Sequence, residues 1–284
     1  MSTHQPPTPQ APAAVPGGAY PGYSSPIPVV RTHLGHALAS EWTKIRTMRS
    51  TMWTLGVFVL LVIGVGLLAA AAVRDEGGLN GDGALSLGFF GLLVGMMCII
   101  TLGVLTTASE YGTGMIRTTM TACPTRGRVL AAKAIVFTTL AFVVTVVTVS
   151  FVAVVQTSML GDQALAPSGS QWLKATFGIS LYIALLGLLS LLVGSMIRHS
   201  AGAITLMIGA VLAPLVLALF MNATSLEKVQ QALLEYSIPS QMGVFYDNTL
   251  SHSGPTGWDP LWIILGITAA AYAGAYALLR SRDV

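Results

Sequence analysis

The segment SEYGTGMIRTTMTACPTRGRVLAAK (Ser109–Lys133) is a polar stretch between two long apolar runs. The chain as a whole is 54% hydrophobic and only 9% charged, yet this segment holds five charged residues: Glu110, Arg117, Arg126, Arg128 and Lys133. Basic residues are typical of a short loop that stays on the cytoplasmic side of a membrane. That rule explains the basic residues, but it does not explain Glu110 or the helical spacing of Ile116 and Met120.

The apolar runs on both sides predict an all-α integral membrane protein. With a mean hydropathy of +0.73, the 284-residue chain has too few charges to cover a water-exposed globular surface. A spanning helix needs roughly 20 apolar residues, and the runs lack the strict alternation of barrel strands. We therefore predict six transmembrane helices, at about residues 52–73, 86–107, 134–155, 175–197, 202–221 and 261–279.

Basic residues lie mainly on one side of this predicted membrane. If the amino terminus is cytoplasmic, that side receives eleven of the fourteen: Arg31, Lys44, Arg46, Arg49, Arg117, Arg126, Arg128, Lys133, Arg198, Arg280 and Arg282. Because positively charged loops stay in the cytoplasm, both termini are predicted to be cytoplasmic. The net charge of +3 then reflects topology, and it gives no reason to expect nucleic-acid binding.

The amino-terminal residues 1–33 are predicted to form a disordered cytoplasmic tail, which leaves residues 34–284 as the membrane domain. The tail is rich in Pro, Gly and Ala and lacks the apolar clusters that would offset the entropy lost on ordering. It also lacks the basic region and apolar core of a signal peptide.

An amphipathic helix is predicted between this tail and the first span. Its apolar residues recur at helical spacing on one face: Leu34, Leu38, Trp42, Ile45, Met48 and Met52. With Lys44, Arg46 and Arg49 nearby, the helix should lie on the cytoplasmic membrane surface. Glu41 interrupts the apolar face, and two interpretations stay open. The carboxylate either reaches the surface or pairs with a neighbour such as Lys44, or it forms a buried salt bridge to the 109–133 segment.

Residues 222–258 form the longest loop on the predicted external side. Within it Leu226, Val229, Leu233 and Leu234 are spaced as on one face of a short helix, which is expected to end near Ile238 because Pro239 follows. This pattern suits a membrane-parallel or re-entrant helical segment on the outer face.

The sequence lacks the chemistry of several other classes of membrane protein. No ionisable residue lies in the middle of a predicted span, which counts against a proton-coupled carrier. HExxH and GxSxG motifs are absent, so an intramembrane protease is not expected, and no metal or cofactor site is predicted. A P-loop needs a Gly-Lys pair, and none of the four lysines follows glycine. The chain is therefore not expected to be an enzyme, and any ATP hydrolysis is expected in a partner subunit.

The 109–133 segment itself is predicted to begin as a helix. Glu110 and Arg117 are two turns apart, so on a continuous helix they would share a face. Gly112 and Gly114 weaken that helix and permit a bend out of the second span, and Pro124 is expected to end it.

Two stretches resemble a known family. The run SEYGTGMIRTT…PTRGRVLAAK and the run SEWTKIRTMRSTMWT (Ser40–Thr54) are similar to the membrane subunits, or permeases, of bacterial type-2 ATP-binding-cassette exporters. In that family a short cytoplasmic helix, the coupling helix, docks on a separate ATPase subunit. The resemblance places this role on Glu110, Tyr111, Gly112, Gly114, Ile116, Arg117 and Thr118. The sequence departs from the family at Met115, where threonine is frequent.

The same resemblance implies the rest of the expected organisation. It identifies the amphipathic segment as a connecting helix, with Glu41, Trp42, Lys44, Arg46 and Arg49, and residues 222–258 as external re-entrant helices. It also implies an inner (plasma) membrane location and a second permease copy, identical or related, that completes the translocation path. The uncharged spans favour a hydrophobic or amphipathic substrate.

We therefore expect the membrane subunit of an ATP-driven exporter. The alternative is a membrane anchor or regulator that recruits a cytosolic partner without transporting anything. The cargo, the residues that contact it, the role of the tail and the choice between homodimer and heterodimer stay open.

Overall fold

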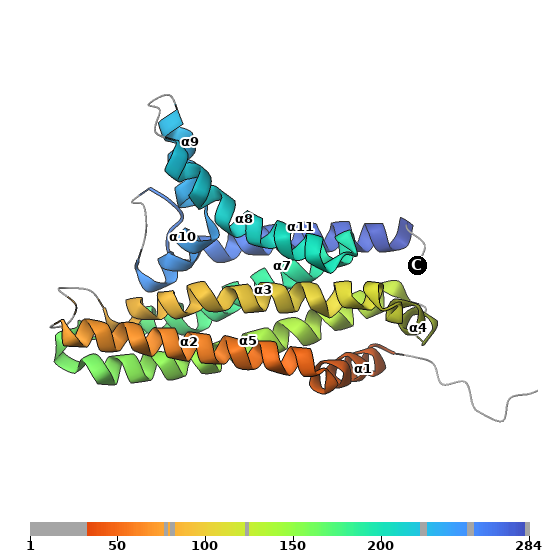
Figure 1. Ribbon diagram of the computed structural model, residues 1–284, viewed down its shortest axis with the longest axis horizontal. Helices are drawn as coiled ribbons and strands as arrows, with labels where there is room; N and C mark the ends of the chain where they lie inside the picture. The colour runs from red at the N-terminus through yellow and green to blue at the C-terminus, as the bar shows by residue number, and fades with distance from the viewer. Residues whose placement is uncertain are drawn as a thin grey trace, which may run out of the picture. The chain divides into compact units, whose positions relative to one another are not determined.

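The computed structural model describes residues 33–76, 79, 83–122, 125–221, 226–248 and 253–281. In this described part six helical segments are long and apolar enough to cross a bilayer: Arg49–Asp75 (α2), Ala84–Gly112 (η1, Ala84–Leu87, and α3, Gly88–Gly112), Arg126–Gln163 (α5, Arg126–Leu160, and η2, Gly161–Gln163), Gly169–Ile197 (α6, Gly169–Leu173, η3, Lys174–Gly178, and α7, Ile179–Ile197), Ser200–Phe220 (α8) and Asp259–Ser281 (α11). Figure 1 shows α2, α3, α5, α7 and α11 running along one another as a bundle.

The six predicted spans are confirmed, and the observed helices extend past most of the predicted ends. Helix α5 is the extreme case, because its 35 residues make a rod of about 52 Å at 1.5 Å per residue. The hydrocarbon core of a bilayer is only about 30 Å thick. The first two turns of α5 therefore belong outside the hydrocarbon, where the polar residues of the 109–133 segment continue the helix.

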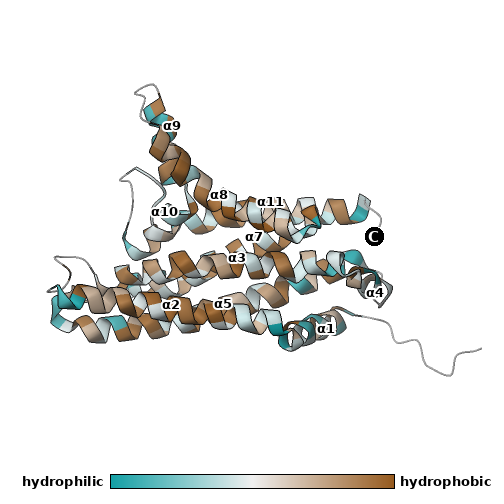
Figure 2. Cartoon of the chain, in the orientation of Figure 1, coloured by the Kyte–Doolittle hydropathy of each residue, from teal (hydrophilic) through white to brown (hydrophobic). Residues whose placement is uncertain are grey.

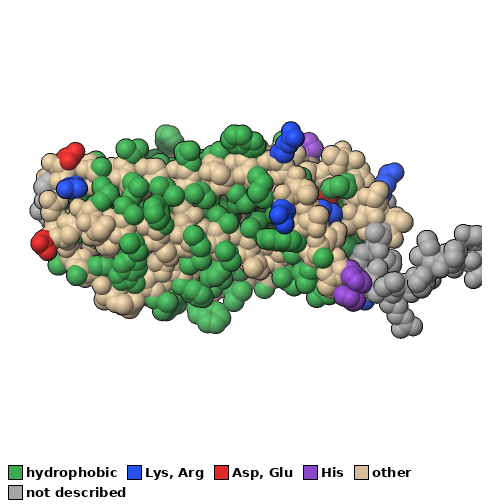
Figure 3. All heavy atoms as spheres, turned by 90° about the horizontal axis from the view of Figure 1, so that it is seen from below, with side chains coloured by type: hydrophobic (Ala, Val, Ile, Leu, Met, Phe, Trp, Pro, Cys, Tyr) green, Lys and Arg blue, Asp and Glu red, His purple; other side chains and the backbone are tan. Residues whose placement is uncertain are grey.

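Hydrophilic residues lie mainly at the two ends of the bundle, and hydrophobic residues predominate in the region between (Figure 2). Most of the basic side chains visible in Figure 3 lie towards one end of this face, and acidic side chains stand out at the other end beside a basic one. We call the end with Lys44, Arg49, Arg126, Arg198 and Arg280 the basic end, and the end with Asp75, Asp162, Asp247 and Asp259 the acidic end.

The amphipathic segment forms a helix of its own, α1 (Leu34–Thr47), which packs against the beginning of α5. The His33 side chain caps its first turn by accepting a hydrogen bond from the backbone N–H of Gly35. The apolar pattern predicts a helix that reaches Met52, but Met48 is extended and α2 begins at Arg49. This break lets α1 turn away from the first span. The predicted tail, apart from His33, lies outside the described residues.

The 109–133 segment is also broken, so the continuous helix on which Glu110 and Arg117 would share a face does not form, and the bend that Gly112 and Gly114 permit is present. Helix α3 ends at Gly112, and α4 (Met115–Ala122) follows as a separate short helix. Gly114 adopts a positive φ of 73°, which glycine tolerates without strain. The turn at Gly114 redirects the chain, and the expected stop at Pro124 lies outside the described residues.

The long loop beyond α8 holds two short helices, α9 (Glu227–Glu235) and α10 (Ile238–Gly243), and a 3₁₀ turn, η5 (Val244–Tyr246). The first helix ends at Glu235, earlier than predicted, and Pro239 lies in the first turn of α10, where its missing N–H is harmless. Met242 and Phe245 are completely buried in the main core. The loop therefore packs into the bundle at the acidic end, while α9 rises away from it (Figure 1).

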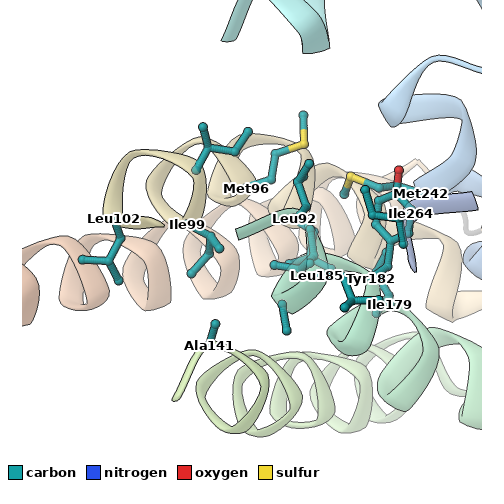
Figure 4. Close-up of a cluster of buried hydrophobic side chains, with 14 of the residues drawn as sticks. Leu92, Met96, Ile99, Leu102, Ala141, Ile179, Tyr182, Leu185, Met242 and Ile264 are labelled. Atoms are coloured by element: carbon teal, nitrogen blue, oxygen red, sulfur yellow. The ribbon is translucent and has the colours of Figure 1, made fainter. Parts of the chain in front are cut away.

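The core lies around α3 and α7, which are the most deeply buried of the six spans. Leu92, Met96 and Ile99 of α3 belong to one buried cluster with Ile179 and Tyr182 of α7, and Ala141 of α5 and Ile264 of α11 are part of the same cluster (Figure 4). Small residues allow the two central helices to approach closely. A Cβ on Gly103 would lie only 2.4 Å from the carbonyl oxygen of Gly187.

Because the two helices lie so close together at Gly103, even one added methyl group is expected to clash there. Gly103→Ala should lower the free energy of unfolding by about 1–3 kcal/mol, because the added methyl group forces α3 and α7 apart. Gly266→Ala on α11 is the matched control, since a Cβ there would meet no atom within 4 Å. Thermal unfolding in detergent measures both. Equal melting temperatures for the two variants would contradict the close packing.

Candidate functional site

Four charged side chains form a closed ring at the basic end. Lys44 Nζ lies 2.8 Å from Glu41 Oε1 and 3.1 Å from Glu110 Oε1. Lys133 Nζ lies 2.8 Å from Glu41 Oε2 and 2.6 Å from Glu110 Oε1. Each lysine thus contacts both glutamates, and we call this set of residues the charge ring.

Three helices supply the ring. Glu41 and Lys44 are three residues apart on α1, so they lie on the same face of that helix. Glu110 lies in the last turn of α3, and Lys133 lies two turns into α5. The ring therefore joins the helix that precedes the first span to the ends of the second and third spans.

The ring is buried, so each of its charges needs an oppositely charged partner. The side chains of Glu41, Glu110 and Lys133 are each only 3–4% exposed, and that of Lys44 is 22% exposed. Isolated charges are strongly destabilised away from water, so buried charges need partners. Among the described acids at the basic end there are only Glu41 and Glu110, and both are members of the ring.

The lysine at the edge of the ring keeps its charge. Burial by itself would lower the pKa of Lys44, but the hydrogen bond to Glu41 and the charges of Glu110 and Glu41 outweigh it. The pKa of Lys44 is therefore raised above its ordinary value of 10.5. Lys44 is protonated at neutral pH and serves as a permanent cation between the two carboxylates.

Helix α4 is attached directly to the ring. Lys44 Nζ donates a third hydrogen bond, of 3.3 Å, to Thr119 Oγ1 of α4. Ile116 is buried and Met120 packs against the core, so these two residues hold the inner face of α4. The opposite face carries Arg117, Thr118 and Thr121, which are exposed. Figure 1 shows α4 at the same end of the bundle as α1 and the end of α11.

A family model described as ABC-2 family transporter protein matches residues 37–222 of the chain. The chain belongs to this family. Together with six helices able to span a bilayer, the match makes it a multi-pass membrane protein and the membrane subunit of an ABC transporter, a class that works with an ATPase partner. No curated protein matches the chain.

The residues that the resemblance assigns to coupling occupy two different environments in this ABC-2 subunit. Glu110 and Ile116 are buried, Gly112 ends α3 and Gly114 makes the turn. Tyr111 lies under the guanidinium of Arg198, whose Cζ is 4.9 Å from the ring centre. Of the residues assigned to coupling, only Arg117 and Thr118 present their side chains on the exposed face of α4.

The predicted residues of α1 divide in the same way. Glu41 and Lys44 point into the ring, whereas Trp42, Arg46 and Arg49 are exposed. Both interpretations of Glu41 hold in part, because its carboxylate pairs with Lys44 and also forms a buried salt bridge to Lys133 of the 109–133 segment.

Sequence reasoning did not identify Lys133, Thr119 and Arg198 as site residues. A signal for Lys133 was present, because it is a single lysine among the apolar residues of the helix that follows Arg128. No comparable signal marks Thr119 or Arg198. Among the described residues no group of three or more His, Cys, Asp or Glu could hold a metal ion. The Lys133 amine donates hydrogen bonds to both glutamates, so it is not free to act as a nucleophile.

The burial of the ring predicts an unusually large effect of removing one charge. Lys133→Met should lower the free energy of unfolding by about 3–5 kcal/mol, because both glutamates lose a buried partner. Adding Glu41→Gln should restore part of this loss, since fewer unpaired charges remain. Lys174→Met is the control, because its pairing with Asp247 spans 4.0 Å and leaves the Lys174 side chain 25% and the Asp247 side chain 52% exposed. Chemical or thermal unfolding of the wild type, of the single variants Lys133→Met, Glu41→Gln and Lys174→Met, and of the double variant checks this, and strict additivity in the double variant would contradict the ring.

Proposed function

We propose that this ABC-2 subunit is the membrane-spanning part of an exporter and that α4 is the helix on which a separate cytosolic ATPase docks. The observation that carries the proposal is the construction of α4. Its inner face is fixed by Ile116, Met120 and the hydrogen bond from Lys44 to Thr119, while Arg117, Thr118 and Thr121 remain exposed. A helix held on one side and free on the other suits a docking element that transmits movement.

The proposed orientation places the basic end in the cytoplasm of a cell with an inner (plasma) membrane. Nine described Lys and Arg residues support it: Lys44, Arg46, Arg49, Arg117, Arg126, Arg128, Lys133, Arg198 and Arg280. Only Arg74, Lys174 and Lys228 of the described basic residues belong to the acidic end. The positive-inside rule then puts α1 and α4 where an ATPase is found, and both termini on the same side.

The chain itself carries no P-loop, so ATP hydrolysis is assigned to the partner. ATP binding would shift the ATPase between conformations, and the docked α4 would carry this shift as a rigid-body movement. The ring then passes the movement from α4 to α1, α3 and α5 together. A second copy of this chain, or a related chain, would complete the path.

A hydrophobic or amphipathic substrate suits the surfaces that the bundle offers. The spans carry no charge in their middle, and a cavity of about 540 Å³ opens at the acidic end. Leu85, Phe90 and Phe245 line this cavity together with Gln171 and Asp247. Its size lies within the range of small-molecule sites, and its mixed lining favours a molecule with apolar and polar parts.

The docking role predicts a selective loss of the ATPase. Arg117→Glu should weaken co-purification of the ATPase at least about tenfold, because the reversed charge lies on the exposed face of α4. Arg280→Glu is the matched control, with the same charge change at the same end of the bundle on α11. Both variants should keep the melting temperature of the wild type.

Unchanged ATPase association in Arg117→Glu would remove α4 as the docking element. Vesicles that contain the chain and its ATPase separate export from mere recruitment. ATP-dependent movement of an amphipathic dye across the vesicle membrane supports the exporter. Assembly that ignores ATP and moves no dye supports an anchor instead.

A further inference from the structure

An open groove lies at the basic end, between the beginning of α5 and the last two turns of α11. Its volume is about 700 Å³. Its lining comprises residues 125–128 and Ala131 on the α5 side, Tyr276 and Arg280 of α11, and Leu34 at the start of α1. None of these residues belongs to the charge ring or to the exposed face of α4 described above.

Direct contacts between α5 and α11 hold the two walls of this groove together. The guanidinium of Arg126 donates a hydrogen bond of 2.7 Å to the backbone carbonyl of Leu279, which is 153 residues away along the chain. Beside it Tyr276 packs on Gly127, where a Cβ would lie only 2.8 Å from a carbon of the tyrosine ring. The groove is therefore shaped by the packing of the bundle.

Three guanidinium groups surround the groove. Arg126 and Arg128 are partly buried, and Arg280 is exposed with its Cζ 5.6 Å from the centre of the Tyr276 ring. None of the described residues that line the groove is acidic. Like charges around one space repel one another, whereas an anion in that space attracts all three. The groove is thus positively charged, and it favours an anionic guest.

The chemistry of arginine indicates which anion suits the groove. A guanidinium presents its N–H donors in a planar fork that matches the oxygens of a phosphate. The amino end of α5 adds a partial positive charge, since this helix begins at Arg126. The positive-inside rule accounts for arginines at this end of the bundle. It does not require that arginines from two helices far apart in the sequence line the same groove.

The depth of the groove in the membrane indicates where the phosphate comes from. Helix α11 has 23 residues, which makes it about 34 Å long, and the hydrocarbon core is about 30 Å thick. The last turn of α11, with Arg280, therefore reaches the lipid headgroups. Tyr276 is exposed one turn earlier, as is typical of tyrosine at the membrane interface. Basic pockets between membrane helices at this depth suit acidic headgroups.

We propose that this groove binds the phosphate of an anionic phospholipid from the leaflet at the basic end, with Arg126, Arg128 and Arg280 as the donors. Leu34 and Ala131 offer apolar contacts to the rest of the lipid. Phosphatidylglycerol is the simplest lipid of this chemistry. The site depends only on the membrane location of the chain, and it holds whether or not α4 docks an ATPase.

Native mass spectrometry of the full chain in detergent tests the site directly. Phosphatidylglycerol should bind about tenfold more tightly than phosphatidylcholine, because the choline group of the latter is repelled by the arginines. The double variant Arg128→Gln/Arg280→Gln should remove most of this preference, and it keeps the bond from Arg126 to α11. Arg46→Gln/Arg49→Gln is the matched control, since it removes two exposed charges at the same end but outside the groove.

Three results would overturn the proposal. Equal affinity of the wild type for the two lipids means that the groove does not select an anionic headgroup, and this comparison needs no variant. An equal loss of preference in the control variant means that the basic end attracts acidic lipids only through its total charge. Displacement of phosphatidylglycerol by an equal concentration of inorganic phosphate means that the site takes a soluble anion.

Discussion

Two glutamates and two lysines that are removed from water must find one another, and this requirement organises the basic end of the subunit. Each lysine bridges both carboxylates, so removing any one side chain deprives a buried charge of a partner. The ring thereby fixes how α1 sits on α5 and where α3 ends. Hydrophobic burial alone would not do this, because at a membrane surface α1 could bury its apolar residues in lipid instead. Paired charges are directional, and they select one arrangement.

The ring also explains how a short helix at the edge of the bundle can act on its interior. Helix α4 has only eight residues and touches the rest of the chain through few side chains. Through Thr119 it shares Lys44 with the ring, and the ring joins three helices. One of these, α3, packs tightly on α7, with the carbonyl oxygen of Gly187 close to Gly103. A displacement of α4 thus reaches the centre of the bundle through contacts that are either charged or close-packed.

The six spans were predictable because lipid is a uniform solvent. Long uncharged runs have few alternatives to membrane-spanning helices, and the uneven distribution of Lys and Arg gave the division into two ends. Gly112 and Gly114 indicated the bend before α4. The break at Met48 had no such signal, since methionine is a good helix former and only the packing of α1 against α5 makes the break useful.

The ring could be predicted only in part. Glu41 violated its own helix pattern, which indicated that something beyond α1 determines its place. Its partner Lys133 is 92 residues away along the chain, and local periodicity holds no information about such a pair. Burial of Glu110 is equally a property of the assembled bundle. Residue patterns therefore identified the 109–133 segment as the candidate site. They could not distinguish its buried residues Glu110 and Ile116 from its exposed residues Arg117 and Thr118.

The central claim is that the ring makes α1, α4 and the adjoining ends of α3 and α5 move as one body. Pulsed electron-spin distance measurement between labels at Arg46 on α1 and Thr121 on α4, in the complex with its ATPase, tests this most directly. Both positions are exposed. The account predicts that the distance stays within about 2 Å between the nucleotide-free and ATP-bound complexes, and that the distribution broadens in Glu110→Gln. An ATP-induced change of about 5 Å or more with the ring intact would contradict it.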